Sequence, residues 1–234
     1  MFETRTVLRF ALVAVPVYAV LAFATLSPRW AAAYGDGFRV AGNKVFSRFW
    51  LWPQANVTFL NLRSPTLLAD IDAATPGTLP VQFRPPGPDD VVQDTLMVLQ
   101  NNDAYGSLGL VRTSSRPIGY WPTAIVIALI LATPMGRLRK LVALVLALLL
   151  VHVFIAFRVT VMLLKTGFAD PAKKYNLFSP SVFWQDVLRR LDEVFADNPT
   201  FAYVVPVFIW LGVVFVVHLV KTRRKPQPAI EADA

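Results

Sequence analysis

The chain of 234 residues contains no cysteine and only two histidines. The missing cysteines exclude disulfides, thiolate nucleophiles, metal sites built on thiolates and a lipid-modified cysteine anchor. Charged residues are also scarce, at 16% of the chain against about 25% in typical soluble domains. The sequence has no P-loop, no dinucleotide-binding glycine motif and no His-rich cluster, so it predicts no cofactor and no metal. These shortages leave few classes of enzyme open.

Hydrophobic residues, by contrast, make up 55% of the chain and gather in long runs. A helix of about 18 to 20 apolar residues is long enough to cross the bilayer core. The runs at 10–27 and 201–220 have this length, and a middle run is about twice as long. The sequence TPMGRLRK, residues 133–140, interrupts the middle run and divides it into spans at 119–135 and 141–164. The sequence therefore predicts a membrane α-helical protein with four transmembrane helices.

Positive charges next to these spans predict the orientation. Nine Lys and Arg residues lie in three short segments that four spans place on one side of the membrane. The two long segments on the other side, 28–118 and 165–200, carry 12 of the 15 acidic residues. The positive-inside rule then predicts a plasma membrane protein with both termini in the cytoplasm and both long segments outside the cell. No basic stripe with interleaved aromatic residues is present, so the net charge of +8 predicts no nucleic-acid partner.

The predicted domains follow from these boundaries. They are the N-terminal flank with the first span (1–27), an extracytoplasmic α+β domain (28–118), a hairpin of the second and third spans (119–164), a second extracytoplasmic segment (165–200), the fourth span (201–220) and a cytoplasmic tail (221–234). Two fates are open for the first span, because Ala22-Phe23-Ala24 is a pattern that signal peptidase can cut. The apolar run continues through Leu26 and reaches spanning length, which favours an uncleaved anchor.

The first extracytoplasmic domain is expected to be mainly β. Residues 30–50 carry apolar side chains at helical spacing, so they are expected to extend the first span or to lie on the bilayer surface, although Gly35, Gly37 and Gly42 weaken this helix. After them come short runs rich in β-branched and apolar residues, separated by Pro, Gly and Ser. Five strands are expected in a small antiparallel sheet or sandwich, at 56–62, 66–72, 79–85, 94–101 and 107–113.

The second extracytoplasmic segment is expected to contain an amphipathic helix. Ser179 can cap this helix and Pro180 can occupy its first turn. From Trp184 to Phe195, apolar side chains recur at helical spacing on one side, with charged side chains on the other. Such a helix is expected either to lie in the membrane interface or to cover the sheet.

Arg158 is a charged residue inside the third predicted span. It lies about 9 Å from the outer end of that span at 1.5 Å per helical residue, so its guanidinium almost reaches the headgroups. Two roles are open: a structural one, in which Arg158 pairs with a carbonyl or with an acid such as Asp94 or Asp103, and a functional one. His152 is expected near the bilayer centre, about 120° around the helix from Arg158, so the two are not expected to share a site. His218 is expected at the inner end of the fourth span.

The segment TSSRPIGYWP, residues 113–122, places Ser114 and Ser115 at the outer mouth of the second span, level with Arg158. A polar site before one span, a basic turn, and a second span carrying an arginine in IAFRVTVMLL resemble the core of the exosortase and archaeosortase family. Members of that family are multi-pass transpeptidases that process sorting signals at the outer membrane face. The resemblance covers about residues 113–164 and implies Ser114 or Ser115 as the nucleophile, with Arg158 as the catalytic arginine.

The chain departs from that family at two positions. The family uses a cysteine nucleophile and a histidine after the arginine at the outer face, and this sequence has neither. A serine also needs a positioned base, and none is evident near Ser114. The sequence therefore favours a non-catalytic membrane protein whose extracytoplasmic domain scaffolds or binds an envelope protein, or a second copy of the chain, while the helices contact the lipid bilayer. A transpeptidase or protease of exosortase type, active or degenerate, is the alternative, and a transporter subunit is the third hypothesis.

Overall fold

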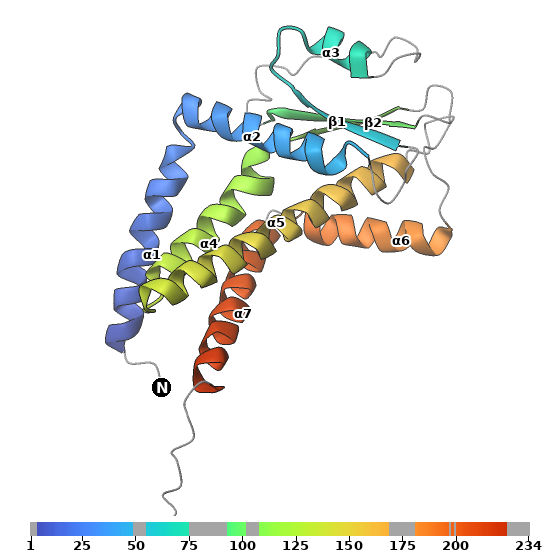
Figure 1. Ribbon diagram of the computed structural model, residues 1–234. Coiled ribbons are helices and arrows are strands. Elements are labelled where there is room, and N and C mark those ends of the chain that lie inside the picture. The colour runs from blue at the N-terminus through green and yellow to red at the C-terminus, as the bar shows by residue number, and fades with distance from the viewer. Residues whose placement is uncertain are drawn as a thin grey trace, which may run out of the picture.

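The computed structural model of the protein describes residues 4–48, 55–74, 93–101, 108–168, 181–196, 198 and 200–223 (Figure 1). The protein is mainly helical and has one three-stranded sheet. Three helices in the described ranges are long and apolar enough to cross a membrane, at Val7–Ala24, Arg137–Gly167 and Phe201–Leu219. They belong to α1 (Thr4–Ala24), α5 (Arg137–Phe168) and α7 (Phe201–Arg223).

A fourth apolar helix, α4 (Trp121–Ala132), packs among these three and contacts each of them. A π-helical turn, η1 (Arg116–Tyr120), leads directly into it. Long-range polar contacts tie the bundle together: the Tyr120 hydroxyl donates to the Leu21 carbonyl at 2.7 Å, and the Trp210 indole donates to the Thr133 hydroxyl at 2.8 Å. The first bond holds α1 on η1, and the second holds α7 on the end of α4.

The second predicted span is the one that the structure leaves unconfirmed as a crossing. It was expected at 119–135, but the apolar helical stretch found there, Arg116–Ala132, begins and ends three residues earlier and is shorter than the three candidate spans. At 1.5 Å per residue it covers about 25 Å of a hydrocarbon core of about 30 Å. The non-helical connection between the second and third predicted spans is also shorter than expected, because the cations of 137–140 belong to the first turn of α5. As α5 continues to Phe168, Arg158 lies about 15 Å from its end, farther than the 9 Å expected.

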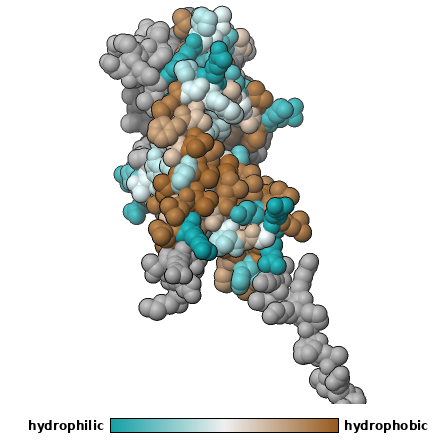
Figure 2. Space-filling model, turned by 90° about the vertical axis from the view of Figure 1, so that its left-hand side faces the viewer, coloured by the Kyte–Doolittle hydropathy of each residue, from teal (hydrophilic) through white to brown (hydrophobic). Residues whose placement is uncertain are grey.

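Exposed apolar side chains cover the outside of the bundle. Figure 2, which faces the side where α1 lies, shows hydrophobic residues gathered across the middle of the molecule, with hydrophilic ones above and below. On α1 this surface includes Leu12, Val15 and Val20, each at least 65% exposed. A continuous apolar surface of this kind is costly in water and favourable against lipid. The described part of the chain is thus compatible with a membrane protein.

The sheet confirms three of the predicted strands. It is antiparallel in the order β1 (Ala55–Asn61), β2 (Thr95–Asn101) and β3 (Leu108–Thr113), with Phe59 opposite Met97 and Leu99 opposite Gly109. The central strand β2 is buried on both faces. One face of the sheet contributes Phe59 to a core shared with the helix bundle, and the other packs on α3.

The expectation of a strand at 66–72 was wrong, because this segment forms the helix α3 (Leu67–Ala74). Leu67 and Ile71 are both buried against the sheet while Ala69 between them is exposed, a pattern that a helix produces and an alternating strand does not. The Asp70 carboxylate accepts hydrogen bonds from the hydroxyls of Ser64 and Thr66 at 3.3 and 3.1 Å, which fixes the first turn. The strand expected at 79–85 lies outside the described residues.

The helical prediction at 30–50 is confirmed by α2 (Pro28–Phe46), which turns away from α1 and runs across the sheet (Figure 1). Its glycines weaken an isolated helix but allow close packing here. An added Cβ at Gly42 would lie 2.7 Å from the Phe59 ring, and one at Gly35 would lie 3.2 Å from the Arg39 guanidinium. Packing against β1 therefore compensates for the poor helix propensity.

The amphipathic helix predicted in the segment 165–200 is present as α6 (Val182–Leu191), followed by a π-helical turn, η2 (Asp192–Ala196). Its N-cap residue is Ser181, and the predicted cap Ser179 lies outside the described residues together with Pro180. Leu188 is buried, and the helix packs on α5 and not on the sheet. Three apolar side chains of its first turn remain exposed: Val182, Phe183 and Trp184. Of the two places predicted for this helix, covering the sheet was wrong.

Candidate functional site

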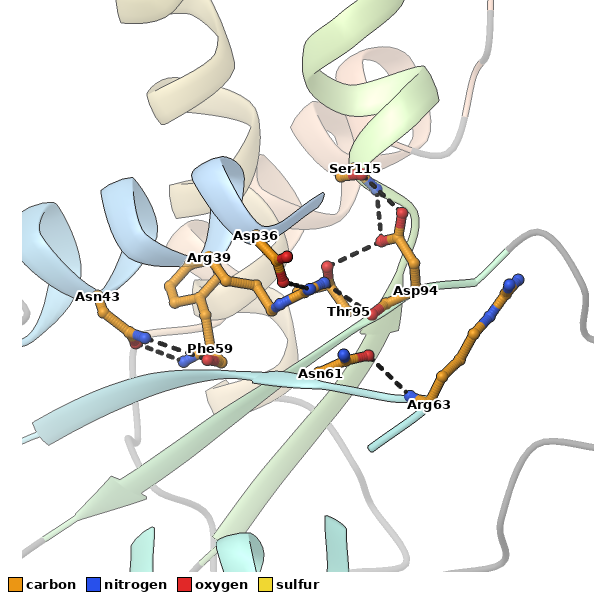
Figure 3. Close-up of polar contacts among 9 residues, drawn as sticks. All are labelled: Asp36, Arg39, Asn43, Phe59, Asn61, Arg63, Asp94, Thr95 and Ser115. Atoms are coloured by element: carbon orange, nitrogen blue, oxygen red, sulfur yellow. Dashed lines mark hydrogen bonds and ion pairs between the residues drawn. The ribbon is translucent and has the colours of Figure 1, made fainter. Parts of the chain in front are cut away.

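A polar network joins the sheet to the start of α4, with Asp94 at its centre (Figure 3). The Asp94 carboxylate accepts from the Ser115 backbone N–H at 2.9 Å and from the Ser115 hydroxyl at 2.6 Å. It also accepts from the Thr95 hydroxyl at 2.8 Å. Because Ser115 precedes η1, this carboxylate satisfies a backbone donor that the helix itself leaves unpaired. A loop residue before β2 thus caps the helix that leads down into the bundle.

Arg39 extends the network to α2 (Figure 3). Its guanidinium donates to the Asp94 backbone carbonyl at 3.1 Å and to the Asp36 carboxylate at 2.5 Å. Arg39 is only 8% exposed, so it is held in one orientation by groups on two elements. Asp94 therefore receives bonds through its side chain from the start of α4 and through its main chain from α2. The sheet is fixed between the two helices at this point.

Asn43, one turn further along α2, holds the outer edge of β1. Its side-chain amide accepts from the Phe59 N–H at 2.7 Å and donates to the Phe59 carbonyl at 3.1 Å, as a neighbouring strand would do. Nearer the start of α2, Tyr34 packs edge-on against Tyr120 with ring centroids 5.0 Å apart. Burial raises the pKa of the Tyr34 phenol well above its ordinary value of 10.0, so this hydroxyl stays protonated. Contacts made along the stretch from Tyr34 to Asn43 thus hold α2 on η1 and on the sheet.

A polar cavity of about 350 Å³ opens beside this network, where α1 turns into α2. Three arginines line it, Arg39, Arg63 and Arg116, together with Asp36, Asp94 and Asn61. Leu26 and Pro28 form its edge at the end of α1. A second cavity of about 340 Å³ lies between α2 and α5 and is almost entirely apolar. The first cavity combines charge with concavity and is the better candidate for recognising a ligand.

Ser114, Ser115 and Arg158, the residues implied by the family resemblance, lie around one turn. The Arg158 guanidinium, 2% exposed, donates to the Pro117 carbonyl at 3.1 Å. Ser115 is fully buried on Asp94, and the Ser114 hydroxyl is buried without a hydrogen-bond partner in the part of the chain described here. Of the partners predicted for Arg158, the structure supplies a carbonyl, while Asp94 binds Ser115 and Asp103 lies outside the described residues. Their catalytic role stays a prediction.

The two histidines lie apart from this turn. The Nδ1 atom of His152 is 2.7 Å from the Leu148 carbonyl, and its exposed ring borders the apolar cavity between α2 and α5. Arg158 is buried on another face of the same helix, as its spacing from His152 predicts. His218 is exposed near the end of α7.

Sequence reasoning did not single out Arg39 or Arg116. Arg39 carried a detectable signal, because it occupies the face of α2 that also presents Ala31, Gly35 and Gly42. A charged residue on a stripe of small residues is expected to be buried with a partner. Nothing local marks Arg116, because it reaches the cavity only through the packing of η1 beside α2.

Comparison of the chain with protein-family models, with curated proteins and with solved structures finds no match.

Proposed function

We propose that the protein is a multi-pass membrane protein whose sheet, with α2 and α3, acts as an extracytoplasmic binding or assembly module of a bacterial-type cell envelope. In this proposal α1, α4, α5 and α7 cross the plasma membrane, both termini are cytoplasmic and α1 is an uncleaved anchor. The contacts of α1 with Tyr120 and Trp210 support its retention, because cleavage after Ala24 would separate it from the bundle. A short α4 is accommodated by local thinning of the bilayer.

One observation carries the proposal: the bonds of Asp94 to Ser115 and Arg39 fix the sheet on the helices. A domain tethered by flexible linkers loses orientational freedom when it binds a partner, whereas a domain held at two helices has already lost it. The sheet with α2 and α3, called the platform below, presents α3 on the side away from the bundle (Figure 1). On α3, Leu68 is 55% exposed beside the buried Leu67. This exposed leucine is a suitable contact for a partner protein.

Because the chain has no cysteine, a single introduced cysteine is the only thiol in it that a maleimide can label, and its labelling reports the side of the membrane on which it lies. In spheroplasts, Leu68→Cys is expected to react with a membrane-impermeant maleimide, whereas Gly136→Cys, between α4 and α5, is expected to react only after permeabilisation. A benzophenone maleimide attached at Leu68→Cys is then expected to give one protein adduct of defined mass on irradiation. Val145→Cys, on the exposed apolar surface of α5, is the matched control and is expected to give none. Labelling of Leu68→Cys only from the inside would overturn the topology, and absence of an adduct would overturn the assembly role.

A transpeptidase of exosortase type is the second candidate, and it is favoured by the meeting of Arg158 with the Ser114-Ser115 turn. The buried Ser114 hydroxyl is the better nucleophile of the two serines, because that of Ser115 donates to Asp94. If this candidate is correct, Ser114→Ala abolishes complementation of a deletion strain while the protein level and melting temperature stay unchanged. The assembly proposal predicts full complementation by Ser114→Ala, so one strain separates the two. Thr123→Ala, which also removes a hydroxyl near this turn, is the control.

A further inference from the structure

The arginine-lined cavity has the charge pattern of an anion site. Its three arginines face two aspartates, and both carboxylates are already bonded within the site: Asp36 to Arg39, and Asp94 to Ser115 and Thr95. A metal cation there would meet three guanidinium groups. An anion would meet two carboxylates, each of which already accepts hydrogen bonds from donors of the site. The lining therefore favours a negatively charged ligand.

Arg116 is the group best placed to bind such an anion. Its partly exposed side chain lines the cavity and makes no hydrogen bond or ion pair with any other described residue. Arg39, in contrast, is held rigidly by Asp36 and the Asp94 carbonyl and forms a fixed positive wall. A guanidinium presents a planar fork of donors that matches two oxygens of one phosphate or carboxylate. Arg116, whose donors are uncommitted among the described residues, and the fixed Arg39 can thus hold an anion between them.

The surroundings of the cavity favour a phosphate ester over other anions. The cavity opens at the corner between α1 and α2, where the chain leaves the apolar belt. Three large apolar side chains around this corner are at least 66% exposed: Phe23, Leu26 and Trp30. A tryptophan beside exposed aliphatic residues is typical of the bilayer interface, where lipid phosphates are concentrated. A phospholipid there would place its headgroup at the arginines and its tails along α1.

We propose that this cavity binds a phosphate ester through Arg116 and Arg39, either as the headgroup of an anionic phospholipid or as a soluble phosphate. The inference rests on the proposed function, because it takes the cavity to lie at the membrane surface beside the binding module. A bound headgroup would fix the depth of α2 and with it the height of the sheet above the bilayer. The site would then couple the platform to the lipid composition of the membrane.

The test uses the purified full chain in neutral detergent, with native mass spectrometry as the readout. Three probes separate the sources of the anion: dioleoylphosphatidylglycerol, dioleoylglycerol, which has the same tails without phosphate, and glycerol 3-phosphate. Arg116→Gln is expected to weaken phosphatidylglycerol binding by about tenfold to a hundredfold, the effect of losing a charge-assisted hydrogen bond. Arg29→Gln is the matched control, because Arg29 is an exposed arginine on the same corner that does not line the cavity. Ala32→Trp fills the cavity without changing charge and is expected to weaken binding as well.

Each probe outcome has one meaning. Phosphatidylglycerol binding that exceeds glycerol 3-phosphate binding and depends on Arg116 assigns a lipid headgroup, and equal Arg116-dependent binding of the two assigns a soluble phosphate ester. If dioleoylglycerol binds as well as phosphatidylglycerol, or if Arg29→Gln weakens binding as much as Arg116→Gln, the proposal is overturned. The crosslink at Leu68 forms on the opposite face of the sheet. If Leu68→Cys gives no crosslink while the probes still bind in an Arg116-dependent way, the assembly role alone is rejected. If the crosslink forms but no Arg116-dependent binding is found, the phosphate site alone is rejected.

Discussion

Replacing Asp94 with alanine is expected to lower the free energy of unfolding by about 3 kcal/mol, which is large for one partly exposed side chain. The substitution removes three hydrogen bonds at once, two from Ser115 and one from Thr95. Ser115 and Thr95 are both fully buried, so water cannot readily replace the lost acceptor. Bonds to a charged group contribute about 1.5 to 3 kcal/mol each, and their sum is reduced because the three share one carboxylate.

Unfolding in mixed micelles of increasing SDS content, followed by circular dichroism, measures this loss. Asp94→Asn keeps the shape and one acceptor oxygen, so it is expected to lose about half as much. Asp72→Ala removes an exposed carboxylate on α3 and is expected to change stability by less than about 0.5 kcal/mol. Equal stability of Asp94→Ala and Asp72→Ala would show that the network does not hold the sheet on the helices. The central observation behind the proposed function would then fail with it.

Replacing Phe59 with alanine is expected to lower the free energy of unfolding by about 3 to 5 kcal/mol. Phe59 is 3% exposed and lies between Phe38 and Phe46, with ring centroids 6.1 and 5.8 Å away. Asn43 bonds both the N–H and the carbonyl of Phe59, so the strand cannot move inward to fill the cavity that the substitution leaves. The residual cavity adds to the lost hydrophobic burial, which places the cost toward the upper end of this range.

Gly42 provides a double-mutant test of the same contact. A Cβ at position 42 would approach three atoms of the Phe59 ring at 2.7 to 2.8 Å, so Gly42→Ala alone is expected to cost roughly 1 to 2 kcal/mol after its gain in helix propensity. In the Phe59→Ala background the obstacle is gone, and Gly42→Ala is expected to stabilise by up to about 1 kcal/mol. Gly37→Ala, with no heavy atom within 4 Å of its added Cβ, is expected to stabilise in both backgrounds. Additive effects of the two substitutions would contradict the packing of α2 on β1.

The two perturbations act on α2 about one turn apart. Asp94 bonds to Arg39, and Phe59 packs on Gly42. Arg39 and Asp94 line the same cavity as Arg116, whereas Phe59 does not, so Asp94→Ala is expected to weaken the proposed phosphate site while Phe59→Ala acts mainly on stability. The site thus depends on the same contacts that position the platform.

Long apolar runs and short β-branched runs could be read directly from the sequence. Three helices of spanning length, the helix over 28–46, the amphipathic helix after 180 and three strands in antiparallel order all follow from local periodicity and turn residues. The misread element, 67–74, is short, and over one or two turns the alternation of a strand and the spacing of a helix are nearly the same pattern. In the folded protein the segment is a helix that buries Leu67 and Ile71 against the sheet and leaves Ala69 exposed, whereas a strand would place all three side chains on one face.

By itself, then, the sequence determined the order of the apolar helices, the location of the sheet between the first two of them and the position of Arg158 within an apolar helix. Only the tertiary structure decided which polar residues meet. Asp94 and Ser115 are 21 residues apart, Arg39 and Asp94 are 55 apart, and Arg158 and Pro117 are 41 apart. Hydrogen bonds at such separations leave no trace in local periodicity, because they arise only after α2 and the sheet have packed on the helices. The candidate site is therefore formed by tertiary packing, and the sequence alone does not indicate which of its residues come together.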